Sequence, residues 1–171
     1  MSNRIVIIGA GSTNFGLGIV GDFFKSKILS GSTLVLHDIN PETLKNTYEI
    51  ALSYKEKLGV NFNIESTTSR SDALKKADFC LISIEVGNRF ELWEQDWKVP
   101  LQYGIKQVYG ENGGAGGLFH AMRQVPAIIK ICEDIEKICP EAFVFSYSNP
   151  MQRICHALNT RFPNLRITGL C

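Results

Sequence analysis

Two glycines after an apolar run are the first residues of this sequence whose spacing suggests chemistry. Gly9 and Gly11 follow the stretch RIVIIG (4–9), and Ser12 and Thr13 come directly after them. Glycines at such a turn let the backbone approach a pyrophosphate, whose charge is met by the N–H groups that open the next helix. The motif predicts a dinucleotide site, although a turn between any strand and helix can carry two glycines.

Asp38 strengthens the dinucleotide prediction. It stands at the end of the second apolar run, 27 residues after Gly11, where a carboxylate can accept both hydroxyls of an adenosine ribose. Its charge would oppose a 2′-phosphate by about 1 to 4 kcal/mol at 4 Å, so we expect NAD rather than NADP. The third glycine of the fingerprint is missing, because Asn14 stands there and Gly16 follows two residues later. A carboxylate that only caps the next turn is the alternative for Asp38.

The elements that would position these residues alternate between strand and helix. Apolar, β-branched runs predict six strands. They cover 4–9, 32–38, 61–67, 78–86, 142–148 and 165–170. Helical patterns predict helices over 15–28, 41–58, 71–76, 118–138 and 150–161. A long loop with six glycines, residues 104–117, lies between the fourth strand and the fourth helix.

Strands separated by helices pair in parallel through right-handed crossovers. Six of them predict an α/β fold of the Rossmann type, a doubly wound, mostly parallel sheet in the order 3-2-1-4-5-6 with helices on both faces. The length of 171 residues is that of one domain.

Composition limits the class of partner. Lys and Arg number 18, Asp and Glu number 17, and the charges are dispersed, which disfavours nucleic acid and anionic membranes as partners. No apolar run is long enough to span a bilayer. The first predicted strand begins at Arg4, leaving no room for a signal peptide, so we expect a cytoplasmic protein that binds a small molecule. The five cysteines form no CxxC pair and no zinc spacing, and their odd number argues against a disulfide framework.

Several motifs together resemble glycoside hydrolase family 4, the NAD- and metal-dependent glycosidases. They are IVIIGAGST (5–13), SIEVGN (83–88), KVPLQYGIKQVYGENGGAGGLFHAMRQVPAI (98–128), ICPEAFVFSYSNPM (138–151) and ITGLC (167–171). The resemblance spans the chain in register. It implies that bound NAD takes hydride from C3 of a sugar, that the C2 proton is then removed, and that the glycosidic bond is eliminated. Water adds, and the hydride returns.

The resemblance also implies a divalent metal, usually manganese, and a set of site residues. Cys171 matches a metal-ligand cysteine whose partner histidine lies about thirty residues further on in the family, as do the acid and the tyrosine base. Asn149 and Glu111 match positions that bind or line the sugar, and Ile84 and Val86 match positions near the nicotinamide. His37, His120 and His156 match no ligand motif, so we expect them to be structural or on the surface.

The expected substrate follows from the same resemblance. Members that act on 6-phosphosugars carry an arginine at the position of Trp93, which offers only an indole N–H and a stacking face, although Arg89 is close by. Together with the similarity of residues 148–171 to α-galactosidases and α-galacturonidases, this favours an α-galactoside or a hexuronide.

Two other functions stay open at this point. A lactate- or malate-type 2-hydroxy acid dehydrogenase shares the fold but gives no role to the glycine loop or to Cys171. A module that binds NAD without activity is the second. We expect residues 1–171 to be the NAD-binding domain of a protein whose substrate and metal domain is absent from this chain. The fragment alone would then be inactive, and the full-length protein is expected to form a homo-oligomer.

Overall fold

A single parallel sheet organises the molecule. The computed structural model describes residues 2–12 and 16–170. Within them, six strands form one sheet in the order β3-β2-β1-β4-β5-β6, which confirms the predicted Rossmann topology. The strands are β1 (Arg4–Ile8), β2 (Thr33–His37), β3 (Asn63–Thr67), β4 (Phe79–Ile82), β5 (Phe143–Ser146) and β6 (Arg166–Gly169).

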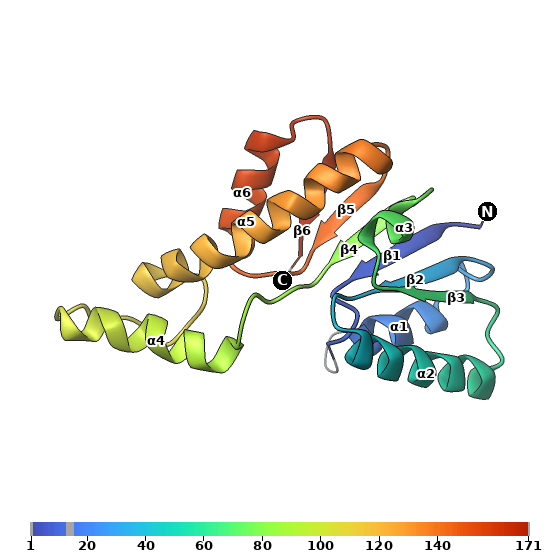
Figure 1. Cartoon of the computed structure of the whole chain (residues 1–171), viewed down its shortest axis with the longest axis horizontal. Helices are drawn as coiled ribbons and strands as arrows, with labels where there is room; N and C mark the ends of the chain where they lie inside the picture. The colour runs from blue at the N-terminus through green and yellow to red at the C-terminus, as the bar shows by residue number, and fades with distance from the viewer. Residues whose placement is uncertain (1, 13–15, 171) are drawn as a thin grey trace.

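Helices cover the sheet on both faces, as Figure 1 shows. They are α1 (Gly16–Lys25), α2 (Pro41–Leu58), α3 (Arg70–Leu74), α4 (Arg89–Gln102), α5 (Gly114–Ile138) and α6 (Met151–Arg161). One apolar cluster packs between α1, α2 and the β1–β3 half of the sheet, with Ile7, Leu36 and Phe24 among its members. The other packs α5 and α6 against β4 and β5 through residues such as Ile128 and Leu158. Burial of these two faces holds the strand ends in place.

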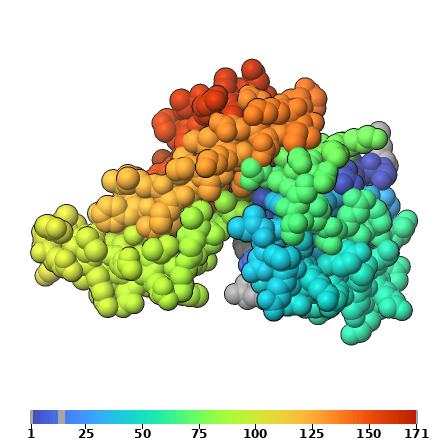
Figure 2. Space-filling view, viewed as in Figure 1, coloured from blue at the N-terminus to red at the C-terminus, as the bar shows by residue number. Residues whose placement is uncertain are grey.

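The strand order creates a crevice at one edge of the sheet. β1 pairs with β2 on one side and with β4 on the other. β2 and β3 therefore extend the sheet in one direction from β1, and β4, β5 and β6 extend it in the other. Ligands of open α/β sheets bind outside the carboxyl ends of the strands at such a switch point. α4 and the start of α5 project beyond this edge, and Figure 2 shows them as a lobe separated by a notch from the lobe of α1 and α2.

Three features differ from the sequence-based expectation. α4 was not predicted, because only Asp96 and Pro100 of its fourteen residues are buried and its apolar side chains follow no clear helical stripe. α5 begins at Gly114 rather than at 118, so the glycine loop is shorter and its last glycines form the first turn of a helix. β4 ends at Ile82, before the expected end at 86.

Cys80, Cys132 and Cys139 are buried small side chains, and Cys155 is half-buried. Among the described residues, Cys80, Cys132, Cys139 and Cys155 are all free thiols. Burial, with a smaller contribution from the nearby carboxylate of Glu136, raises the pKa of Cys132 to about 12. Residues 2–12 and 16–170 contain no helix with the length and hydropathy needed to cross a bilayer.

Candidate active site

The turn after β1 is shaped around Gly9. Its φ of +92° lies in the left-handed region, and its N–H donates to the carbonyl of His37 at 2.9 Å. A Cβ at this position would lie 2.0 Å from the carbonyl oxygen of Ser83, just beyond β4. Only glycine allows the backbone to pass between β2 and β4 here.

Gly11 and Asp38 form one unit across the ends of β1 and β2. The N–H of Gly11 donates to Oδ2 of Asp38 at 2.8 Å, and the N–H of Asn40 donates to Oδ1 at 2.9 Å. A Cβ on Gly11 would lie 2.4 Å from Oγ1 of Thr43 and 2.8 Å from Asp38 Oδ2. Asp38 therefore does cap the next turn, through its contact with the N–H of Asn40. A carboxylate has about four acceptor positions, so two remain for a ribose.

The other nucleotide positions are only partly described. Ser12 is exposed, and its carbonyl accepts from the N–H of Gly16 at 2.8 Å, where α1 begins. Thr13 lies outside the described residues. Ile84 is half-buried against the α5–α6 cluster, and Val86 is half-buried on the segment after β4. The Oγ of Ser148 accepts from the N–H of Ile84 and donates to its carbonyl, both at 2.9 Å.

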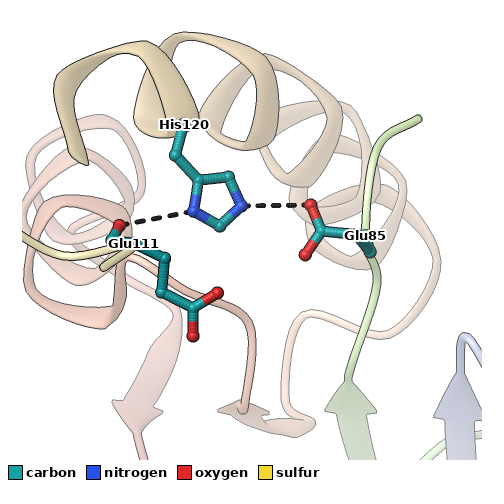
Figure 3. A group of neighbouring side chains, drawn as sticks. All are labelled: Glu85, Glu111 and His120. Carbon is teal, nitrogen blue, oxygen red and sulfur yellow. Dashed lines mark hydrogen bonds and ion pairs between the residues drawn. The ribbon is translucent and has the colours of Figure 1, made fainter. Parts of the chain in front are cut away.

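A polar cluster lies on the segment after β4 and the first turns of α5, as Figure 3 shows. His120 is 4% exposed, and its Nε2 lies 3.0 Å from Oε1 of Glu85. Its Nδ1 lies 3.3 Å from the carbonyl of Glu111. The buried Gln124 donates a short hydrogen bond to the same Oε1 of Glu85. One carboxylate oxygen thus holds two side chains of α5.

The surroundings of His120 favour its charged form. Burial by itself would lower the pKa of its imidazole, because the charged form loses solvation. The hydrogen bond and negative charge of Glu85, together with the Glu111 carbonyl, outweigh that effect and raise the pKa above its ordinary value. A protonated ring can donate to both neighbours at once.

Glu111 is held from two sides. Asn149, which follows β5, donates its Nδ2–H to Oε1 of Glu111 at 2.7 Å. Arg89, in the first turn of α4, donates to Oε2 at 2.9 Å. The guanidinium of Arg89 also lies 5.1 Å over the ring of Trp93, which stacks on Tyr109. The structure therefore brings the two predicted substrate positions, Glu111 and Asn149, into direct contact.

A buried ion pair joins α4 to α5 beneath this group. Arg123 donates from both terminal nitrogens to the two oxygens of Asp96, at 2.9 and 2.5 Å. The side chain of Asp96 is 7% exposed. A small cavity of about 10 Å³ lies beside the pair. Its lining includes Glu85, Arg89, Trp93, Glu111, His120 and Arg123.

Among the described residues, one group of three side chains has ligand atoms close enough together to hold a metal ion. Ligand atoms of Glu85, Glu111 and His120 lie within 4.8 Å of one another. Each of these side chains is already engaged, His120 and Glu85 with each other and Glu111 with Asn149 and Arg89. We therefore assign no metal to this group. Cys171, the expected metal ligand, lies outside the described residues.

The histidines separate into three environments. His37 is buried in β2 with its Nδ1 2.9 Å from the carbonyl of Thr67, and His156 is exposed on α6. These two match the structural or surface role that was expected. His120 is buried in the polar cluster, which sequence reasoning did not identify, nor did it identify Glu85. The signal for Glu85 was its place near the end of the predicted strand over 78–86, at the ligand-binding edge.

Comparison with protein families and curated proteins gives a consistent result. A family model described as "Family 4 glycosyl hydrolase" matches residues 4–171. An α-glucosidase of Erwinia rhapontici is 53% identical over 171 residues, covering 100% of this chain and 38% of the relative. An α-galactosidase of Bacillus subtilis is 32% identical over 168 residues, covering 98% and 39%. The relatives therefore include an α-galactosidase, as the resemblance implied, and also an α-glucosidase, which was not expected.

Solved structures agree with the fold. A 6-phospho-α-glucosidase from gut microorganisms, described in complex with NAD and Mn²⁺, superposes with a TM-score of 0.88 and 26% identity. It covers 100% of this chain and 39% of that one. A malate dehydrogenase of Plasmodium falciparum superposes with a TM-score of 0.67 and 23% identity, covering 100% and 45%, and shares the fold alone. The chain spans about 38% of the length of the relative that it matches at 53% identity.

Proposed function

The chain belongs to family 4 of the glycosyl hydrolases, and on that premise we propose that it is the nucleotide-binding part of an NAD- and manganese-dependent glycosidase. Residues 1–171 form its Rossmann domain, and the remaining length seen in the relatives supplies a second domain with the rest of the active site. The full-length protein would act on an unphosphorylated α-glycoside of a hexose or hexuronic acid. A cytoplasmic location and a homo-oligomeric state belong to the same proposal.

The observation that carries the proposal is the contact between Glu111 and Asn149. These residues are 38 positions apart and meet through a 2.7 Å hydrogen bond. They do so beyond the carboxyl ends of β4 and β5, the edge at which α/β sheets bind ligands. An amide and a carboxylate together can donate to and accept from adjacent sugar hydroxyls. In the proposed complex they orient the ring toward the nucleotide.

The residues around Gly11 fit NAD. The carboxylate of Asp38 is fixed by two backbone N–H groups and keeps acceptor positions for a ribose. Its negative charge disfavours the 2′-phosphate of NADP. Gly9 and Gly11 keep side chains away from the turn where the pyrophosphate would lie. Ser12 and Thr13 extend that turn toward α1, and Ile84 and Val86 would border the nicotinamide.

When bound, NAD supplies a reversible hydride acceptor for C3 of the sugar and the metal polarises the adjacent hydroxyl oxygens. The part played by this chain is to hold the sugar through Glu111 and Asn149 and the ribose through Asp38. Cys171 is proposed as one metal ligand, with the other expected from the length that follows in the relatives. The α-glucosidase and α-galactosidase relatives support an α-glycoside as substrate.

The test of the proposed function uses the full-length protein with NAD, Mn²⁺ and aryl α-glucosides, α-galactosides and α-galacturonides in deuterium oxide. Deuterium should appear at C2 of the released sugar, because the C2 proton is removed and replaced during each turnover. Hydrolysis without exchange, or without dependence on NAD, would contradict the elimination route.

The nucleotide preference is tested on residues 1–171 alone. NAD should raise the melting temperature as mass action requires, and NADP should raise it less. Asp38→Asn should reduce that difference, whereas Asp22→Asn, at an exposed position of α1, should leave it unchanged. Equal shifts with both nucleotides in the wild-type chain would remove Asp38 from the ribose.

A further inference from the structure

We propose that Glu85 is a second sugar-binding carboxylate of this site and that it restricts the substrate to a neutral hexoside. The inference rests on the proposed glycosidase function and narrows it, because it removes uronic acids from the proposed substrate class. It comes from three observations: how Glu85 is held, what the neighbouring cavity offers, and how the charges around it are paired.

Glu85 is anchored through one oxygen only. His120 and Gln124, one turn apart on α5, both contact Oε1 of Glu85. The raised pKa of His120 favours its protonated ring, which donates to that oxygen. Within the part of the chain that the structure describes, Oε2 has no hydrogen-bond partner. The side chain is 30% exposed although its partners are buried. A carboxylate with a fixed orientation and a free oxygen is a ready acceptor for a ligand hydroxyl.

The adjoining cavity suits a hydroxyl group. Its volume of about 10 Å³ is close to that needed for one water-sized oxygen. A hydroxyl can donate to the free oxygen of Glu85, whereas an ionised carboxylate can only accept hydrogen bonds and would face Glu85 with a like charge.

Every cationic side chain among the described residues that line the cavity is already paired with a carboxylate. Arg89 pairs with Glu111, Arg123 pairs with Asp96, and His120 pairs with Glu85. An anionic sugar would have to break one of these pairs or lie beside Glu85 and Glu111 unpaired, which costs free energy in either case. A neutral ring meets neither penalty.

The experiment measures sugar binding to the full-length protein loaded with NAD and Mn²⁺, by isothermal titration calorimetry. The ligands are a methyl α-hexoside, the corresponding methyl α-hexuronide and the hexoside 6-phosphate. The variant is Glu85→Gln, whose amide oxygen can still accept from His120 and Gln124 while its free end becomes a donor. Glu91→Gln, at an exposed position in the first turn of α4, is the matched control. The affinity for NAD serves as the check that each variant is folded.

We expect the wild-type protein to bind the neutral hexoside most tightly. E85Q should weaken that binding by about tenfold or more, the effect of losing a hydrogen bond to a charged group. E85Q should also reduce the difference in affinity between the hexoside and the hexuronide, because the variant lacks the negative charge of Glu85. Three results would overturn the inference: preference of the wild type for either anionic sugar, equal hexoside affinity in E85Q and E91Q, or no binding of any ligand.

Binding and turnover separate the two proposals. If the neutral hexoside binds in a manner that depends on Glu85 but is never cleaved, the glycosidase proposal fails and the inference stands. If glycosides are cleaved with C2 exchange and E85Q has no effect on their binding, the inference fails and the glycosidase stands.

Discussion

Gly11 and Gly18 differ in what surrounds their α-carbons, and that difference predicts opposite effects of the same substitution. A Cβ at Gly11 meets Thr43 and Asp38, whereas at Gly18 in α1 nothing lies within 4 Å. We expect Gly11→Ala to lower the free energy of unfolding by about 1 to 3 kcal/mol, because the neighbours must shift. Gly18→Ala should raise it by about 0.5 to 1 kcal/mol through helix propensity. Urea denaturation of both variants measures this.

NAD affinity adds a second readout for the same pair. A shift of Asp38 in Gly11→Ala displaces the proposed ribose acceptor, so NAD should bind more weakly to that variant and unchanged to Gly18→Ala. If Gly11→Ala bound NAD as tightly as the wild type, the turn would not be the pyrophosphate site.

The raised pKa of His120 predicts a pH dependence with a definite sign. Its protonated form is favoured in the folded state, so its contribution to stability is fully present below the pKa of an unfolded histidine, about 6.5. It is lost as the pH rises through the higher folded value. Replacing Glu85 by Gln removes the main cause of the shift. The stability difference between wild type and E85Q should therefore be largest below about pH 6.5 and shrink as the pH rises above it.

The pH prediction is checked by NMR titration of the His120 ring protons alongside urea denaturation. A His120 pKa at or below the ordinary histidine value of about 6.5 would contradict the assignment. The cluster could not be anticipated from sequence, because residues 85 and 120 are joined only through the tertiary packing of α5 against the segment after β4.

At the scale of elements, the ion pair between Asp96 and Arg123 should be essential for the lobe formed by α4. Removing one partner of a buried pair leaves the other charge unpaired at a cost of about 3 to 5 kcal/mol. We expect Asp96→Asn to unfold α4 locally or to lower the melting temperature. Glu94→Gln on the same helix breaks only an exposed pair with Lys98 and should cost at most about 1 kcal/mol.

Limited proteolysis locates the effect of these two substitutions. Faster cleavage within 89–113 is expected for Asp96→Asn and not for Glu94→Gln. If both variants were cut at the rate of the wild type, α4 would be held by its apolar contacts instead, such as the stacking of Trp93 on Tyr109 and the edge contact of Trp97 with Tyr109.

The contrast between α4 and the sheet explains what sequence could predict. The strand pattern and its order were recoverable because buried strands require continuous apolar runs such as IVII and LVL, whatever the ligand. α4 carries no such stripe, since its main tertiary bond is a charge pair. Glu111 and Asn149 were expected as site residues through the resemblance. Their mutual contact and the ion pair of Glu111 with Arg89 were not, because these depend on the tertiary position of α4 and the glycine loop.

At the scale of the whole molecule, one part of the sheet surface, over β4 and β5, is covered by no helix among the described residues. β4 and β5 turn Phe79, Leu81 and Phe145 away from α5 and α6, and these side chains line an apolar groove with Phe23 and Leu170. Exposed apolar patches of this kind promote association. We expect residues 1–171 to self-associate in a concentration-dependent manner, as measured by sedimentation velocity.

A single charge in the groove should reduce that association. Leu170→Lys places an ammonium at the rim of the groove, whereas Leu58→Lys changes a more exposed leucine at the end of α2, away from the groove. Only the former should shift the sedimentation profile toward monomer. A monomeric wild-type chain, or equal effects of both changes, would show that this face is not the one that associates.

The two-point contact between Ser148 and the backbone of Ile84 has a consequence for how substrate preference could diverge. Ser148 directly precedes Asn149, and Ile84 directly precedes Glu85, so this contact fixes the spacing between the segments that follow β4 and β5. α4 and the glycine loop bring Arg89, Trp93 and Glu111 from outside that frame. Under the proposed function, side chains on α4 and the glycine loop can be exchanged to suit a different sugar without changing the distance between the proposed sugar and nicotinamide positions.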